Sequence, residues 1–123
     1  MIALSAREEW DYVLQEERGT DSPTTFRLRP LTLRDRNEVE DLIGASMGAK
    51  GYPYGTVNTK VLRGGLCGWS GMRDAQGAEV RFVADRDGRI RDDLLERLPS
   101  AISIELATEI LSRSTMTSGD RKN

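Results

Sequence analysis

The sequence contains no histidine, and this absence excludes several kinds of chemistry at once. Nucleophiles that depend on a histidine base, histidine metal ligands and histidine pH switches are all ruled out. The only cysteine, Cys67, cannot form a disulfide within the chain, and a thiolate zinc site is nearly excluded as well. The apolar neighbours of Cys67 predict a buried thiol, with no histidine to activate it. A single cysteine also suits a reducing cytoplasm.

The chain also lacks long apolar runs and an excess of charge of one sign. No apolar stretch near the N-terminus reaches the length of a signal peptide, and none approaches a membrane span. The 18 basic and 20 acidic residues give a net charge of −2, so there is no basic excess to attract nucleic acid. We therefore expect neither a membrane nor a nucleic-acid partner. The 123 residues predict a complete, small cytoplasmic protein whose core needs no metal or disulfide.

The hydrophobic period changes at Pro30. Residues 10–15 and 24–29 alternate between apolar and polar side chains and predict two strands of an antiparallel hairpin. Residues 10–17 also fit a helix, with Trp10, Val13, Leu14 and Glu17 on one face, so this alternative stays open. After Pro30, Thr32 and Asp35 form a capping-box-like pair at the start of a helix that Gly44 is placed to end. Residues 44–55 then predict a flexible loop.

Residues 57–72 fit one face of a helix, with Trp69 as a core anchor. Gly64, Gly65 and Gly68 destabilise a helix by about 1 kcal/mol each relative to alanine, and they are tolerated where another element packs closely. Beyond this segment, residues 74–77 and 85–88 predict turns on either side of a short strand at residues 79–83.

The C-terminal third predicts two helices. Asp92 and Asp93 begin a short one, and Pro99 begins a longer one that is apolar enough for either a core helix or an interaction helix. Residues 115–123 are polar and predict a disordered tail after a single domain over residues 1–114. The predicted fold class is α+β and mostly helical, with an N-terminal β-hairpin or small antiparallel sheet followed by a bundle of about four helices.

No motif indicates catalysis, a cofactor or a metal. The segment around Lys50 lacks the spacing of a P-loop, and the glycines of residues 64–68 do not form a dinucleotide fingerprint. The acidic pairs of residues 85–93 are mixed with arginines, which favours solvated turns over a cation site. We therefore expect a binding or assembly role and no enzyme activity. The candidate partner-binding residues are Leu106, Ile110, Leu111, Tyr52 and Tyr54.

Several stretches, taken in order, resemble the tail assembly chaperones of long-tailed bacteriophages and related prophages. The order of the pieces is more specific than any one of them, and together they cover nearly the whole chain. They are residues 10–14, 23–32, 34–36, 39–42, 65–69, 73–77, 80–82, 94–99, 105–111 and 122–123.

The resemblance implies a non-enzymatic role without a cofactor. Such chaperones bind the long, helical, apolar tape measure protein before tail tube subunits polymerise around it. They help to recruit the tail tube protein, act in the host bacterial cytoplasm and are absent from the mature virion. The alternative is a permanent virion component, such as a head–tail joining or tail completion protein. The sequence predicts no particular oligomeric state.

Overall fold

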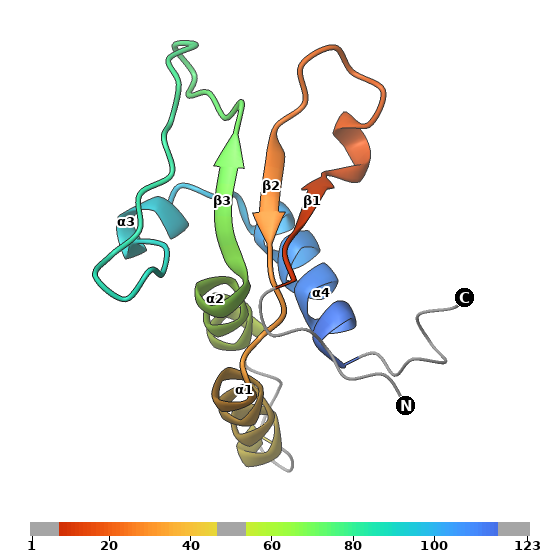
Figure 1. The fold of residues 1–123 in the computed structure, drawn as a ribbon, viewed down its shortest axis with the longest axis vertical. Coiled ribbons are helices and arrows are strands. Elements are labelled where there is room, and N and C mark those ends of the chain that lie inside the picture. Colours follow the sequence, from red (N-terminus) through yellow and green to blue (C-terminus); the bar gives the residue numbers. More distant parts are fainter. Residues whose placement is uncertain (1–7, 47–53, 116–123) are drawn as a thin grey trace.

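The computed structural model describes residues 8–46 and 54–115, and everything below concerns these ranges. The sheet has three antiparallel strands in the order β1-β2-β3, which are Trp10–Val13, Thr25–Leu28 and Leu66–Ser70. A short 3-10 turn, Gln15–Glu17, follows β1. The helices are α1 (Leu33–Ser46), α2 (Tyr54–Gly65), α3 (Asp92–Leu95) and α4 (Ser100–Thr115). The predicted α+β fold, with a small antiparallel sheet and about four helices, is confirmed (Figure 1).

The hairpin of β1 and β2 follows the alternation of its sequence. Phe26 and Leu28 are buried, whereas Arg27 between them is exposed and pairs with Asp11 across the hairpin and with Glu9. Successive side chains of a strand point to opposite faces, so the sheet has one apolar and one charged face. The alternative of a helix over residues 10–17 is wrong, because residues 10–13 pair with β2 and only the short 3-10 turn of residues 15–17 is helical.

The third strand corrects the predicted helix over residues 57–72. The helix ends at Gly65, and the chain continues directly into β3. Leu66 pairs with Leu28, and Trp69 pairs with Phe26. Leu66 and Trp69 are three positions apart in β3, whereas their partners are only two positions apart in β2. A β-bulge accommodates the extra residue and keeps both side chains on the same face. An apolar spacing of three therefore imitated a helix in the sequence.

Trp69 is partly buried against the core. Its ring meets Phe26 edge-to-face at 6.3 Å between centroids and Phe82 at 5.1 Å. Its indole N–H donates to the carbonyl of Val80 at 2.8 Å. Trp69 thus packs as an anchor, but from a strand rather than from a helix.

Two glycines at the end of α2 lie where other elements approach closely. A Cβ atom on Gly65 would lie 2.4 Å from Cγ2 of Ile110 in α4. A Cβ atom on Gly64 would lie 2.7 Å from Cδ2 of Leu31 and 2.8 Å from Oδ2 of Asp35. Real Cβ atoms do not come so near other atoms, so the predicted close packing at these glycines is confirmed.

Helix α1 begins as predicted but does not end as predicted. The backbone N–H of Asp35 donates to Oγ1 of Thr32 at 3.1 Å, as expected for a helix cap. The prediction that Gly44 ends the helix is wrong, because α1 continues to Ser46 and Gly44 lacks a positive φ. The predicted loop over residues 44–55 therefore overlaps the ends of α1 and α2, and its residues 47–53 lie outside the described ranges.

The predicted strand over residues 79–83 is also wrong. Two isolated bridges, Arg73 to Glu79 and Ala84 to Ile90, each close a tight turn instead. In each turn an aspartate carboxylate accepts backbone N–H groups two and four residues later, and a glycine takes a positive φ. These local hydrogen bonds compete with a ladder along β3. Both predicted turns, residues 74–77 and 85–88, are confirmed.

Helix α4 provides much of the core. Leu106, Ala107 and Ile110 have no exposed surface, and α4 packs closely against α2. Ser114, near the end of α4, is also fully buried. Its Oγ accepts from the N–H of Leu31 at 2.9 Å and donates to the carbonyl of Ile110 at 2.7 Å. The predicted tail, residues 115–123, lies outside the described ranges except for Thr115, which ends α4. Among the described residues, no helix is long and apolar enough to cross a membrane.

We predict opposite effects for two glycine-to-alanine substitutions. Gly65→Ala forces a methyl group into Ile110 and should lower the free energy of unfolding by about 1–3 kcal/mol. Gly44→Ala in α1 meets no atom within 4 Å and should raise it by up to about 1 kcal/mol, since alanine favours a helix. Urea unfolding of the two variants measures the difference. Equal effects would contradict the packing at Gly65.

Ser114→Ala should destabilise the fold. The N–H of Leu31 would lose its buried acceptor, which costs about 1–3 kcal/mol. Ser112→Ala, an exposed position two residues earlier in α4, is the matched control and should stay within about 0.5 kcal/mol of the natural chain. Thermal unfolding compares the two, and a similar midpoint for both variants would refute the role of Ser114.

Candidate protein-interaction groove

Two features of the described residues bear on metal binding and thiol chemistry. Within residues 8–46 and 54–115, no group of three or more cysteine, aspartate or glutamate side chains could hold a metal ion. Cys67 is half-buried, and its thiol donates to the carbonyl of Arg27 at 3.3 Å. Burial raises the pKa of Cys67 above its usual value, which disfavours the reactive thiolate.

A groove runs along α2, between this helix, α3 and the first half of α4. We call it the α2–α4 groove. It encloses about 310 Å³, and its lining residues are Tyr54, Gly55, Asn58, Thr59, Leu62, Leu95, Leu98, Ser100, Ser103 and Ile104. Its apolar surface consists of Leu62 from α2, Leu95 from α3, Leu98 just after α3 and Ile104 from α4. The groove thus joins parts of the chain that lie far apart in sequence.

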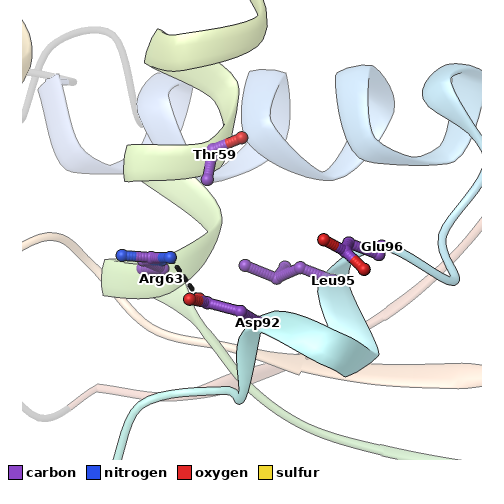
Figure 2. A pocket seen from close by; sticks show the side chains of 5 residues that line it. All are labelled: Thr59, Arg63, Asp92, Leu95 and Glu96. Atoms are coloured by element: carbon purple, nitrogen blue, oxygen red, sulfur yellow. Dashed lines mark hydrogen bonds and ion pairs between the residues drawn. The ribbon is translucent and has the colours of Figure 1, made fainter.

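Beside the groove lies a second hollow of about 310 Å³, whose lining residues Figure 2 shows. Thr59 and Leu95 line both hollows, so the two lie next to each other, and together we call them the channel. At its far end Arg63 of α2 pairs with Asp92 of α3. Glu96 lines the same end. The channel is therefore lined by apolar and uncharged polar side chains along the groove and by charged side chains at the α3 end.

Two large apolar side chains are exposed at the groove. Tyr54 is 67% exposed and Ile104 is 51% exposed, and they come from α2 and α4. Leu33, which is 65% exposed, belongs to α1 and does not line the groove. Exposed apolar residues that gather at one concave place are typical of a protein-binding surface, and tyrosine is common among residues that dominate binding.

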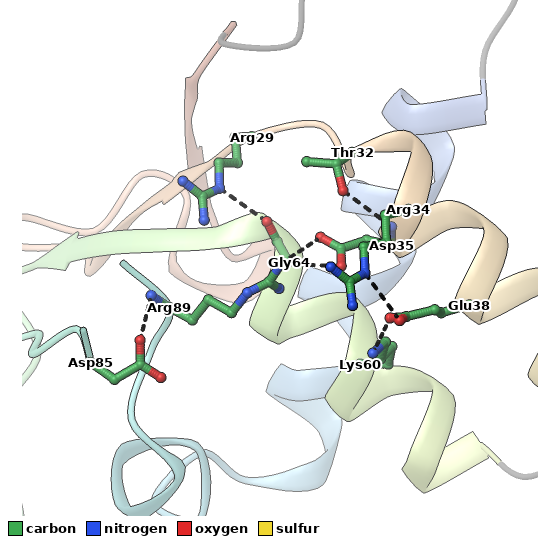
Figure 3. Close-up of polar contacts among 9 residues, drawn as sticks. All are labelled: Arg29, Thr32, Arg34, Asp35, Glu38, Lys60, Gly64, Asp85 and Arg89. Atoms are coloured by element: carbon green, nitrogen blue, oxygen red, sulfur yellow. Dashed lines mark hydrogen bonds and ion pairs between the residues drawn. The ribbon is translucent and has the colours of Figure 1, made fainter. Parts of the chain in front are cut away.

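A polar cluster on another side of α2 is self-contained (Figure 3). Arg89 donates to both carboxylate oxygens of the buried Asp35 at 3.2 Å, and Lys60 pairs with Glu38. The hydrogen bond from Lys60 lowers the pKa of Glu38. Because these cations already have carboxylate partners, the cluster ties α1, α2 and the second turn together. Arg29, also drawn in Figure 3, donates instead to the carbonyl of Gly64 at 3.0 Å.

A second polar contact joins β1 to α4. The Tyr12 hydroxyl donates to Oε2 of Glu105 at 2.6 Å, and the Trp10 indole N–H donates to Oε2 of Glu109 at 3.1 Å. The guanidinium of Arg113 lies over the Trp10 ring at 4.8 Å. These contacts attach one side of α4 to β1 of the sheet. The exposed apolar residue of α4, Ile104, lies at the groove instead.

The partner-binding residues predicted from the sequence differ in how far the structure exposes them. Leu106 and Ile110 have no exposed surface, which corrects the expectation for both: they pack in the core and offer nothing to a partner of the folded chain. Leu111 is partly buried against the core. Tyr54 lines the groove and is exposed. Tyr52 lies outside the described residues.

Ile104 was missed as a candidate, although the sequence held a signal for it. Residues two apart in a helix lie on nearly opposite sides, so Ile104 and Leu106 cannot share one face. With Leu106 in the core, Ile104 must point away from it. Glu96 and Leu95 gave no comparable signal, because only the folded chain brings α3 beside α2.

Comparisons with known proteins identify no relative. No protein-family model, no curated protein sequence and no solved structure matches this chain.

Tyr12 should titrate at unusually high pH. Burial and the hydrogen bond to Glu105 raise its pKa to about 12 from an ordinary value of 10.0. Because the folded chain favours the neutral phenol, this contribution to stability is complete below pH 10 and is lost as the pH rises towards 12. Ultraviolet absorbance of tyrosinate during an alkaline titration should show a late step that Tyr12→Phe removes. A late step that persists in this variant would contradict the assignment.

Proposed function

We propose that this chain is a non-enzymatic tail assembly chaperone of a long-tailed bacteriophage or prophage. In this proposal it binds the tape measure protein in the host bacterial cytoplasm, helps to recruit tail tube subunits and does not remain in the mature virion. The ordered resemblance along the chain supports the family and the partners. The observation that supports the mode of action is the α2–α4 groove, with Tyr54 and Ile104 exposed at its rim.

The shape of the groove suits a helical partner. From Tyr54 to Arg63 the α2 wall extends about 14 Å, at a rise of about 1.5 Å per residue. That length accommodates between two and three turns of a helix laid along it. A helix binds such a groove through apolar residues spaced three or four apart. Covering the apolar stripe of a tape measure helix in this way would keep that stripe from aggregating.

The charge of the chain agrees with apolar binding. The net charge is −2, and the ion pairs around α2 are formed within the chain itself. Binding through buried apolar area responds weakly to salt, whereas binding through charge weakens steeply. We therefore expect the affinity for the tape measure protein to change little between low and physiological salt.

The test is co-expression with the long, helical protein encoded next to this chain. We expect that protein to be insoluble alone and soluble in complex. Ile104→Glu should weaken the complex at least tenfold, because it places a charge in the apolar groove (tenfold is about 1.4 kcal/mol). Leu33→Glu, at an equally exposed apolar position outside the groove, is the matched control and should bind normally. Circular dichroism checks that both variants fold.

Three results would contradict the proposal. Absence of any complex with the tape measure protein would reject the chaperone function. Recovery of the chain in stoichiometric amounts from purified mature particles would favour the alternative, a head–tail joining or tail completion protein. A steep loss of binding between low and physiological salt would indicate a charged partner surface instead.

A further inference from the structure

We infer that the α2–α4 groove accepts an amphipathic helix in one position along the channel, with a basic residue of that helix at the α3 end beside Glu96. The inference rests on the proposed function for the identity of the partner protein. The docking surface and the chemistry of the bound helix are argued from the groove itself.

The charged side chains of the channel all lie at one end. Arg63, Asp92 and Glu96 line the hollow beside α3 (Figure 2). Arg63 already pairs with Asp92, which neutralises both. Glu96 is exposed, and within the described residues its carboxylate has no hydrogen-bond or ion-pair partner. One negative charge is thus left over at this end. Arg97 follows in the chain but does not line the channel.

The other end of the channel carries no charge. Tyr54, Ser100 and Ser103 line it, and their side chains are aromatic or hydroxyl-bearing. Between the two ends the lining combines the apolar Leu62 and Leu95 with the polar but uncharged Asn58 and Thr59. A helix with an apolar stripe can slide in such a channel unless something fixes its position. A basic residue that pairs with Glu96 fixes it, because complementary charges set the register of an interface.

The α2 wall lets a helix come close. Gly55 has no atom within 4 Å of the place where a Cβ would be, and Thr59 follows one turn later. Small side chains on one helix allow the backbone of another to approach. This feature agrees with a helix as the occupant, whereas the charge at the α3 end determines which helix binds best.

Synthetic helices test the inference on the intact chain. Two labelled peptides of about 14 residues are identical and alanine-based, with leucine at every third or fourth position. Their ends are blocked, and one carries a lysine where the other carries a glutamate. Each is made with the charged residue at either end, since a helix can lie in the channel in both directions. Fluorescence anisotropy measures the affinity.

We expect the better lysine peptide to bind about fivefold more tightly than its glutamate counterpart at low salt, the size of an exposed charge interaction. Glu96→Gln should abolish this preference. Glu40→Gln, at an exposed glutamate of α1 away from the channel, is the matched control and should preserve it. Ile104→Glu should lower the affinity for all the peptides.

The inference is overturned if no peptide binds, if lysine and glutamate peptides bind equally, or if Glu96→Gln leaves the preference unchanged. These failures remain distinct from failure of the proposed function. A chain that still solubilises the tape measure protein while ignoring every peptide retains its function and loses this docking surface. A chain that binds the lysine peptide through Glu96 but forms no complex with the tape measure protein retains the surface and loses the proposed partner.

Discussion

The close approach at the end of α2 is the constraint on which the rest of the structure depends. At Gly64 and Gly65 the chain passes from α2 into β3. A Cβ atom on Gly64 would collide with Leu31, and a Cβ atom on Gly65 would collide with Ile110. At Gly65 the backbone of α2 lies against the Ile110 side chain of α4, and β3, which pairs with β2, follows directly. The α2–α4 groove is lined by the same two helices, from Tyr54 in α2 and from Ile104 in α4.

Electrostatic contacts then hold the remaining wall of the groove. Arg89 reaches the buried Asp35 of α1, and Arg63 of α2 pairs with Asp92 at the start of α3. A buried carboxylate without its partner is costly, so the pair of Asp35 and Arg89 positions the second turn firmly. The segment after that turn becomes α3, which supplies Leu95 and Glu96. The polar cluster in Figure 3 and the hollow in Figure 2 thus both include residues of one helix, α2.

Helix α4 explains why an apolar helix need not be an interaction helix along its whole length. Its Leu106 and Ile110 lie in the core, and Glu105 and Glu109 bind the side chains of β1. Only the region near Ile104 remains available at the groove. A protein that presents a small apolar surface on a neutral, well-packed body can bind an apolar partner without aggregating itself.

The sequence by itself determined the α+β class, the second strand of the first hairpin, the cap at Thr32, both aspartate turns and the need for close packing at Gly64 and Gly65. These features depend on neighbouring residues, whose periodicity and turn chemistry act locally. It could not determine the switch from helix to strand at Leu66, since a β-bulge and a helix place Leu66 and Trp69 on one face equally well. Nor could it determine the groove, because which apolar residues become core and which remain exposed depends on how α2, α3 and α4 pack. Only the tertiary structure buries Leu106 and leaves Ile104 exposed, because this difference depends on contacts between residues far apart in the chain.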